Sequence, residues 1–149
     1  MVITDKLNQD LKAAMLAGDK PLVSTLRGLK SAILYVEVAQ GARDSGLPEQ
    51  QIIEILAKES KKRQESVELY RQGGNDQQAS VELAEKAVID GYLPRQLSED
   101  ELREVVDTAI AELDAKDKQA MGKVIGLVKQ RTSGAADGAL IAKLVKERL

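Results

Sequence analysis

Apolar residues recur every three or four positions along almost the whole chain, the spacing that places them on one face of an α-helix. The first such stripe, over residues 4–17, ends at Gly18, and the second runs to about Gln40. Asp19 is placed to cap the second helix, and Pro21 falls in its first turn, where the missing backbone N–H does no harm. No segment alternates apolar and polar residues long enough to predict a strand. The pattern therefore predicts an all-α protein.

Two more helices are expected before a break in the pattern. One begins at Pro48 and continues to about Arg71, and the other spans about 76–92. The turn between them is predicted by the glycine-rich segment 73–75. The apolar stripe of the fourth helix is expected to consist of Leu83, Ala84, Ala87 and Val88.

The break around Pro94 predicts a domain boundary. Proline disfavours helix at the preceding residue, and Ser98 with Glu101 three residues later forms a capping box that starts a new helix. We therefore predict an N-terminal helical bundle over residues 1–93 and a small three-helix C-terminal domain over residues 94–149.

The second and third helices of the C-terminal domain also have start and stop signals. Asp117 is expected to cap a helix that runs to about Arg131, and Gly134 is expected to end it in a left-handed conformation. Asp137 is expected to cap the last helix, which reaches the end of the chain.

Two glycines interrupt the helix that follows Asp117. Glycine in a helix interior costs about 1 kcal/mol relative to alanine, yet Gly122 and Gly126 lie one turn apart beside the apolar face, with Lys123 and Lys129 on either side. Close packing against another helix would explain this bare strip. A groove in which a sugar-phosphate backbone lies against main chain would also explain it, with Gly138 at the anion-favouring start of the last helix. The sequence leaves both interpretations open.

Charge is balanced overall but not along the chain. With 22 basic and 24 acidic residues the chain is not a polycation that would coat nucleic acid. Residues 118–149 nevertheless carry seven basic side chains against two acidic ones. A second basic run, from Lys58 to Arg63, is interpreted as an ion-pair face because glutamates lie one helical turn away. The candidate nucleic-acid-binding residues are Gly122, Lys123, Gly126, Lys129, Arg131, Gly138, Lys143 and Lys146.

The composition argues against a self-contained catalytic site. The chain has no cysteine and no histidine, which removes thiolate chemistry and the commonest acid/base group and metal ligand. Ser60–Lys61 and Lys30–Ser31 are adjacent pairs, but neighbours on a helix point in different directions. We therefore predict no catalytic residues, no cofactor and no metal site.

The remaining features concern location and aromatic residues. No stretch approaches the roughly 20 apolar residues of a membrane span, and the first residues lack the apolar core of a signal peptide, so no membrane association and a cytoplasmic location are expected. Tyr35, Tyr70 and Tyr92 are the only aromatic residues and are interpreted as core residues rather than as platforms for stacking bases.

A series of short motifs is spread along the chain. They are Leu26–Arg27, Leu29–Ile33, Lys62–Ser66, Tyr70–Arg71, Tyr92–Pro94, Gln96–Glu99, Met121–Val124 with Gly126, and Gly134 with Ala136–Gly138. These motifs resemble the GatB/YqeY family, and within it the YqeY-like proteins. The resemblance covers nearly the full length of the chain, and the order and spacing of the motifs make it specific.

This resemblance implies both a fold and a function. It implies an N-terminal helical bundle joined to a three-helix domain similar to the tail of the GatB subunit of aspartyl/glutamyl-tRNA amidotransferase, a carbon–nitrogen ligase that uses glutamine as amido donor. By this similarity we expect an accessory protein that binds tRNA through its C-terminal domain and has no complete catalytic site of its own. The alternative is a helical adaptor that binds another protein through the glycine strip or the N-terminal bundle.

Overall fold

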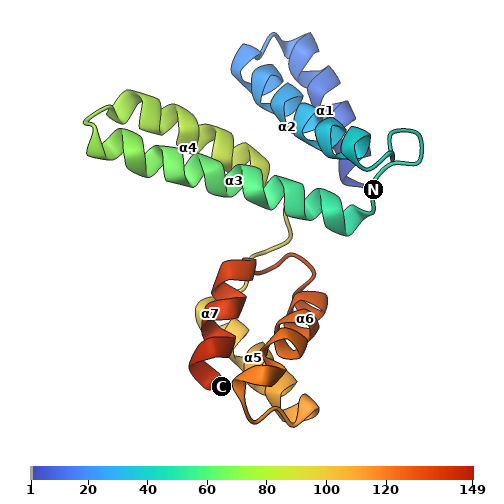
Figure 1. Ribbon diagram of the computed structural model, residues 1–149. Coiled ribbons are helices and arrows are strands. Elements are labelled where there is room, and N and C mark those ends of the chain that lie inside the picture. The colour runs from blue at the N-terminus through green and yellow to red at the C-terminus, as the bar shows by residue number, and fades with distance from the viewer. Residues whose placement is uncertain (1) are drawn as a thin grey trace. The chain divides into compact units, whose positions relative to one another are not determined.

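The computed structural model describes residues 2–149, and within that range it contains helices and loops but no strand (Figure 1). The all-α prediction is confirmed. Backbone contacts divide the chain into two compact units, one ending at Leu93 and the other spanning Pro94–Leu149. That each unit is an independent domain stays a prediction. The helices are α1 Ile3–Ala17, α2 Lys20–Ala39, α3 Glu49–Gln72, α4 Asp76–Asp90, α5 Glu99–Leu113, the 3₁₀ helix η1 Lys118–Ala120, α6 Met121–Thr132 and α7 Gly138–Arg148.

The N-terminal unit consists of two helical hairpins, α1 with α2 and α3 with α4 (Figure 1). The first hairpin turns at Gly18, whose φ of 70° is left-handed, and Asp19 then caps α2 by accepting a hydrogen bond from the Leu22 N–H at 3.2 Å. Both features follow the prediction from the sequence. All four helices contribute to one core, formed by the buried side chains of Leu7, Ala14, Leu26, Leu29, Ile33, Ile52, Leu56 and Ile89.

The predicted apolar stripe of α4 is confirmed only for Val88, which packs against the core. Leu83, which is 42% exposed, Ala84 and Ala87 lie on the exposed side of the helix, whereas Ile89 is completely buried. The face that α4 turns toward α3 also carries polar groups, since Asp90 accepts a hydrogen bond from the Ser60 hydroxyl and Glu85 accepts one from Arg63 at 3.4 Å. Because charged residues occupy part of this face, the hydrophobic pattern alone did not indicate which side of α4 packs against α3.

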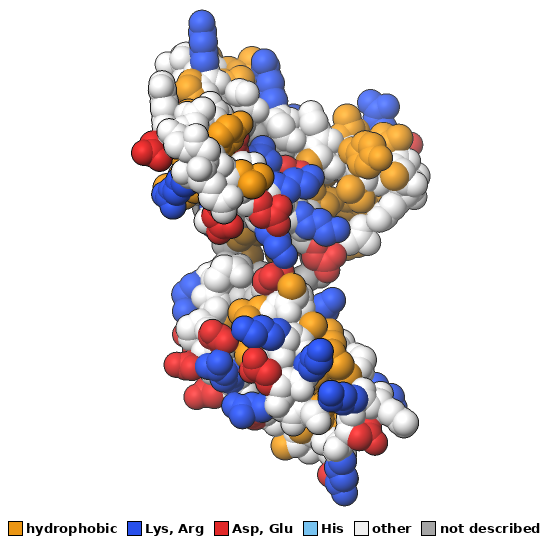
Figure 2. All heavy atoms as spheres, turned by 60° about the vertical axis from the view of Figure 1, so that its left-hand side comes forward, with side chains coloured by type: hydrophobic (Ala, Val, Ile, Leu, Met, Phe, Trp, Pro, Cys, Tyr) orange, Lys and Arg blue, Asp and Glu red, His pale blue; other side chains and the backbone are white. Residues whose placement is uncertain are grey.

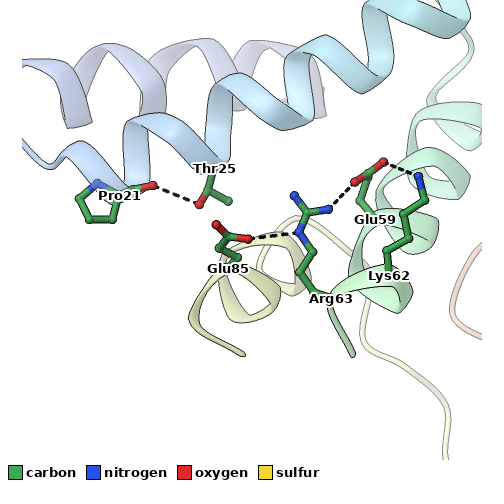
Figure 3. Close-up of polar contacts among 6 residues, drawn as sticks. All are labelled: Pro21, Thr25, Glu59, Lys62, Arg63 and Glu85. Atoms are coloured by element: carbon green, nitrogen blue, oxygen red, sulfur yellow. Dashed lines mark hydrogen bonds and ion pairs between the residues drawn. The ribbon is translucent and has the colours of Figure 1, made fainter. Parts of the chain in front are cut away.

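The basic run on α3 forms ion pairs, as the sequence predicted. Figure 3 shows the Arg63 guanidinium lying between Glu59 of its own helix and Glu85 of α4. Lys62 also pairs with Glu59, at 3.3 Å. The Arg63 side chain is only 20% exposed, so this arginine connects α3 and α4 and does not lie on a solvent-exposed surface.

The interpretation of the tyrosines as core residues is wrong for Tyr35, which is 78% exposed on α2. Tyr92 is partly buried, as expected, and its hydroxyl donates a hydrogen bond to the Asp10 carboxylate of α1. Lys6 lies with its ammonium group 5.2 Å from the centre of the Tyr92 ring. Burial, with the bond to Asp10 and its negative charge, raises the pKa of the Tyr92 phenol. Tyr92 therefore attaches the end of the N-terminal unit to α1.

The C-terminal unit packs α5, α6 and α7 around a core of its own. Ser98 caps α5 by accepting a hydrogen bond from the Glu101 N–H at 3.1 Å, as predicted. The start of the unit is attached to the loop before α7, because the Leu97 N–H donates to the Ala135 carbonyl at 2.8 Å. The buried core residues are Leu102, Val106, Ala109, Val124, Val128, Ile141, Leu144 and Val145.

The ends of α6 differ in detail from the prediction. Asp117 accepts a hydrogen bond from the Gln119 N–H at 3.0 Å and so caps η1, and α6 itself begins at Met121. At the other end both Ser133 (φ 46°) and Gly134 (φ 85°) are left-handed. Asp137 occupies the N-cap position of α7, but its side chain forms no capping hydrogen bond with the helix, so the expected cap is only partly confirmed.

Candidate nucleic-acid interface

The two glycines of α6 form an exposed strip. Val124 and Val128 point into the core and are completely buried, whereas Gly122 and Gly126 lie on the exposed side of the helix. A Cβ atom built on either glycine would have nothing within 4 Å apart from its own helix and chain neighbours. Within the C-terminal unit, therefore, no helix packs against the strip, and the helix-packing interpretation is wrong for the described residues of that unit. The strip is open to a ligand.

A lysine from this strip reaches the neighbouring helix. The Cε atom of Lys129 lies 3.4 Å from the position that a Cβ on Gly138 would occupy, and its Nζ atom lies 3.6 Å away. Gly138 is the first residue of α7, so its missing side chain leaves room for the lysine. One continuous surface thus includes the exposed backbone of α6, the Lys129 ammonium group and the start of α7. The exposed Lys123 lies on the other side of the glycines.

The arginines of the C-terminal unit lie in ion pairs with acidic residues of α5. Arg131 of α6 pairs with Glu112, and Arg148 of α7 pairs with Asp107 at 3.1 Å. These two pairs connect α6 and α7 to α5. Arg131 is consequently directed toward α5 and away from the glycine strip, although the sequence grouped it with the candidate binding residues.

Two further arginines neutralise the start of α5. Arg103 pairs with Glu99 at 2.9 Å and with Asp100 at 3.0 Å, and Arg95 pairs with Glu101 at 2.9 Å. The hydrogen bond from Arg95 is the main cause that lowers the pKa of the Glu101 carboxyl group. These pairs hold the three acidic residues in the first turn of α5 close to arginine.

The lysines of the C-terminal unit are distributed differently. Figure 2 shows basic side chains over the surface of the unit, interspersed with acidic ones. Lys116 pairs with Asp114 at 3.6 Å, but five other lysines are exposed and form no ion pair among residues 2–149. They lie on η1, α6 and α7: Lys118, Lys123, Lys129, Lys143 and Lys146.

Because the arginines are paired with carboxylates and most of the lysines are not, the lysines determine what this surface can bind. An exposed lysine without a carboxylate partner can neutralise a phosphate group without first breaking an ion pair, and bare helix backbone allows that phosphate to come close. The structure brings Gly122, Lys123, Gly126, Lys129 and Gly138 together, and it places Lys143 and Lys146 one turn apart on the exposed side of α7. Lys118, which was not among the candidate binding residues, is also exposed, on η1 directly before the glycine helix.

Comparison with known proteins agrees with the motifs. The family model described as Yqey-like protein matches residues 4–149. The chain belongs to this family. A relative from Pyrenophora tritici-repentis (strain Pt-1C-BFP), named altered inheritance of mitochondria protein 41, mitochondrial, is 28% identical over 152 residues, which cover 98% of this chain and 80% of the relative. The resemblance to YqeY-like proteins is thereby confirmed.

The location of the protein stays a prediction. Within residues 2–149 no helix is both long enough and apolar enough to cross a membrane. The name of the fungal relative places that protein in mitochondria. The expected cytoplasmic location is therefore not supported by this relative.

Proposed function

We propose that this YqeY-like protein binds tRNA through its C-terminal unit, by contacts to the phosphate backbone. The observation that carries the proposal is the open glycine strip of α6 between two exposed lysines, Lys123 and Lys129. Phosphates can approach the bare helix there, and the lysines neutralise their charge. Family membership supports the proposal through the resemblance to the tail of the GatB subunit.

The ligand is folded RNA rather than a single strand of a given sequence. Recognition of single-stranded bases relies on aromatic side chains on which the bases stack. The chain has three tyrosines and no phenylalanine or tryptophan, and all three tyrosines precede Pro94. A surface of lysine and backbone instead recognises the spacing of phosphates, which depends on the shape of the RNA.

The proposed role in the cell is that of an accessory protein. By similarity to the GatB tail, the C-terminal unit holds tRNA for a glutamine-dependent amidotransferase system, and the chemistry takes place on another protein. The lack of histidine and cysteine supports a role without a catalytic site of its own.

Nuclear magnetic resonance tests the proposal residue by residue. Unfractionated tRNA added to the full ¹⁵N-labelled chain is expected to shift or broaden the amide signals of Gly122 and Gly126. The signals of Gly18 and Gly46, which lie in turns of the N-terminal unit, serve as controls and are expected to change little. Single-stranded oligouridine is expected to cause smaller changes at the same concentration. Changes confined to the N-terminal unit would contradict the proposal.

A second candidate function, that of a helical adaptor, is favoured by one observation. The N-terminal unit exposes large apolar side chains on one face of α2, including Tyr35 and Val38, which are 78% and 59% exposed. The dependence on salt distinguishes the two functions, because phosphate contacts release counterions and weaken steeply as salt is added, whereas apolar contacts between helices change little.

A further inference from the structure

One face of α2 carries a regular series of residues that the core does not use. Positions 20, 24, 27, 31, 34 and 38 are separated alternately by four and three residues. This is the spacing of the contact positions in a coiled coil, which returns to the same side of a helix every 3.5 residues on average. We call this series, with the adjacent Tyr35, the α2 seam. The core residues Leu26, Leu29 and Ile33 lie on the other side of α2.

The α2 seam is exposed and slightly hollowed. Its apolar end consists of Leu34 (42% exposed), Tyr35 (78%) and Val38 (59%), which line a shallow depression together with Ser31 and Ala39. A second depression, toward the start of α2, is lined by Met15, Gly18, Lys20, Val23, Ser24 and Arg27. Figure 2 shows hydrophobic side chains gathered at the surface of the N-terminal unit. Such a cluster on an exposed helix is typical of an interaction surface.

We propose that the α2 seam binds an amphipathic α-helix of a partner protein, with apolar residues at alternating spacings of three and four and with carboxylates facing the start of α2. This proposal does not depend on RNA binding, because the seam lies in the N-terminal unit.

The shape of the seam fits a helix. The span from Lys20 to Val38 corresponds to about 27 Å at the rise of an α-helix, the length of about five turns of a partner. On either side of Arg27 the seam has small residues, Ser24 and Ser31, with Gly28 beside them. A Cβ on Gly28 would have nothing within 4 Å, so a partner backbone can approach closely at this point. Large apolar residues at one end then provide the anchor.

Charge selects the kind of helix. Lys20, Arg27 and Lys30 are the basic residues of α2, and Glu37, near its end, is the only acidic one. Acidic side chains on the partner would therefore be attracted to the start of α2. A second copy in the parallel orientation would oppose basic residues to basic residues, and one in the antiparallel orientation would oppose the basic start of α2 to its apolar end. A membrane surface would be met by a wide apolar face, whereas this seam has three large apolar residues at one end and Ser24 between Lys20 and Arg27.

A designed peptide tests the proposal on the full chain. The probe is a fluorescein-labelled 21-residue helix with leucine at alternating spacings of three and four and glutamate beside these positions in one half. A matched peptide has lysine in place of glutamate, and a third has the acidic sequence scrambled. Fluorescence anisotropy is expected to show binding of the acidic helix at least tenfold tighter than binding of either control peptide.

Variants of the protein assign the binding to the seam. The double variant Tyr35→Ser/Val38→Ser is expected to weaken binding about tenfold or more, since buried anchors dominate such interfaces. Arg27→Glu is expected to remove most of the preference for the glutamate peptide over the lysine peptide, since it leaves only Lys20 and Lys30 as basic residues of α2. Leu69→Ser on α3 removes an apolar residue of similar exposure, 68%, and is expected to leave binding unchanged.

Three results would overturn the proposal. The first is acidic-peptide binding no tighter than that of the scrambled peptide, and the second is equal weakening by Leu69→Ser and by the double variant. The third is an alternative occupant. Sedimentation showing a dimer that Tyr35→Ser/Val38→Ser converts to a monomer would assign the seam to a second copy, and retention on anionic vesicles lost in that variant would assign it to a membrane. Unchanged far-ultraviolet circular dichroism of the variants confirms that they remain folded.

Discussion

Replacement of Gly126 by alanine tests the open strip directly. The added methyl group would meet nothing within 4 Å, and the residue lies inside α6, so the substitution introduces neither a clash nor backbone strain. The gain in helix propensity should then appear almost in full, about 1 kcal/mol in the free energy of unfolding of the C-terminal unit. If another helix covered the strip, the same methyl group would instead destabilise the unit by roughly 1–3 kcal/mol.

Hydrogen exchange measured by mass spectrometry is the suitable assay for this change. The three tyrosines all lie in the N-terminal unit, so their fluorescence does not report on α6. A gain of 1 kcal/mol should slow the exchange of protected α6 amides about fivefold, where exchange proceeds through unfolding of the unit. Gly134→Ala serves as the contrasting control, because its φ of 85° is left-handed and a side chain there is strained. Gly134→Ala should therefore exchange faster than the wild type.

The result that would refute this reasoning is faster exchange in Gly126→Ala. It would mean that something presses against the strip in solution, and the strip could not also receive a phosphate backbone. Slower exchange combined with weaker tRNA binding would support the proposed groove, since the methyl group would occupy the space that the backbone of the RNA needs.

Three further predictions concern the fold. A fragment of residues 94–149 should remain helical by circular dichroism, though with marginal stability, because its helices bury a core of their own; a random-coil spectrum would show that the two units form one domain. Ser98→Ala should destabilise α5 by about 1 kcal/mol in urea unfolding, because the Glu101 N–H loses its capping oxygen, and Ser98→Asp should restore most of the loss. Tyr92→Phe should remove the hydrogen bond from the phenol to Asp10 and with it a contribution to the free energy of unfolding. Because the fold raises the pKa of this phenol, that contribution is fully present below the ordinary tyrosine pKa of about 10 and is lost as the pH rises above it. Urea midpoints measured for wild type and variant from neutral to alkaline pH should therefore converge, and a constant difference would contradict the assignment.

Much of the fold could be predicted from the sequence because its helix signals are local. Asp19 and Ser98 accept the capping hydrogen bonds expected of them, and Gly18 adopts the left-handed conformation expected at the end of α1. Each of these signals depends on residues within one turn of the helix, so no knowledge of tertiary contacts is needed.

The wrong predictions for α4 and Tyr35 concern tertiary packing. The side of α4 that faces α3 includes charged groups whose partners, Ser60 and Arg63, lie more than 20 residues earlier. Tyr35 is apolar in pattern but faces away from the core, which the spacing alone does not decide. The ion pair of Arg131 could not be predicted either, because its partner Glu112 lies on another helix. The spacing of apolar residues within one helix does not indicate which ion pairs that helix forms with another.

In the candidate site, too, some features could be predicted from the sequence and others required the structure. The glycines and lysines of α6 could be placed on one side of a helix from their spacing. Whether a neighbouring helix covered that side required the structure, as did the reach of Lys129 to Gly138. The sequence therefore predicted the components of the surface but not whether the strip is open.

The most direct test of tRNA binding is the dependence of the affinity on salt. The logarithm of the association constant of the full chain for tRNA should fall linearly with the logarithm of the salt concentration, with a slope of about −0.9 for each duplex phosphate that is neutralised. Lys123→Ala and Lys129→Ala should each weaken binding and make the slope shallower by roughly 1. Lys12→Ala, which removes an exposed lysine of α1 and changes the net charge equally, should leave the slope unchanged. An affinity independent of salt, or equal slopes in all three variants and the wild type, would contradict the account.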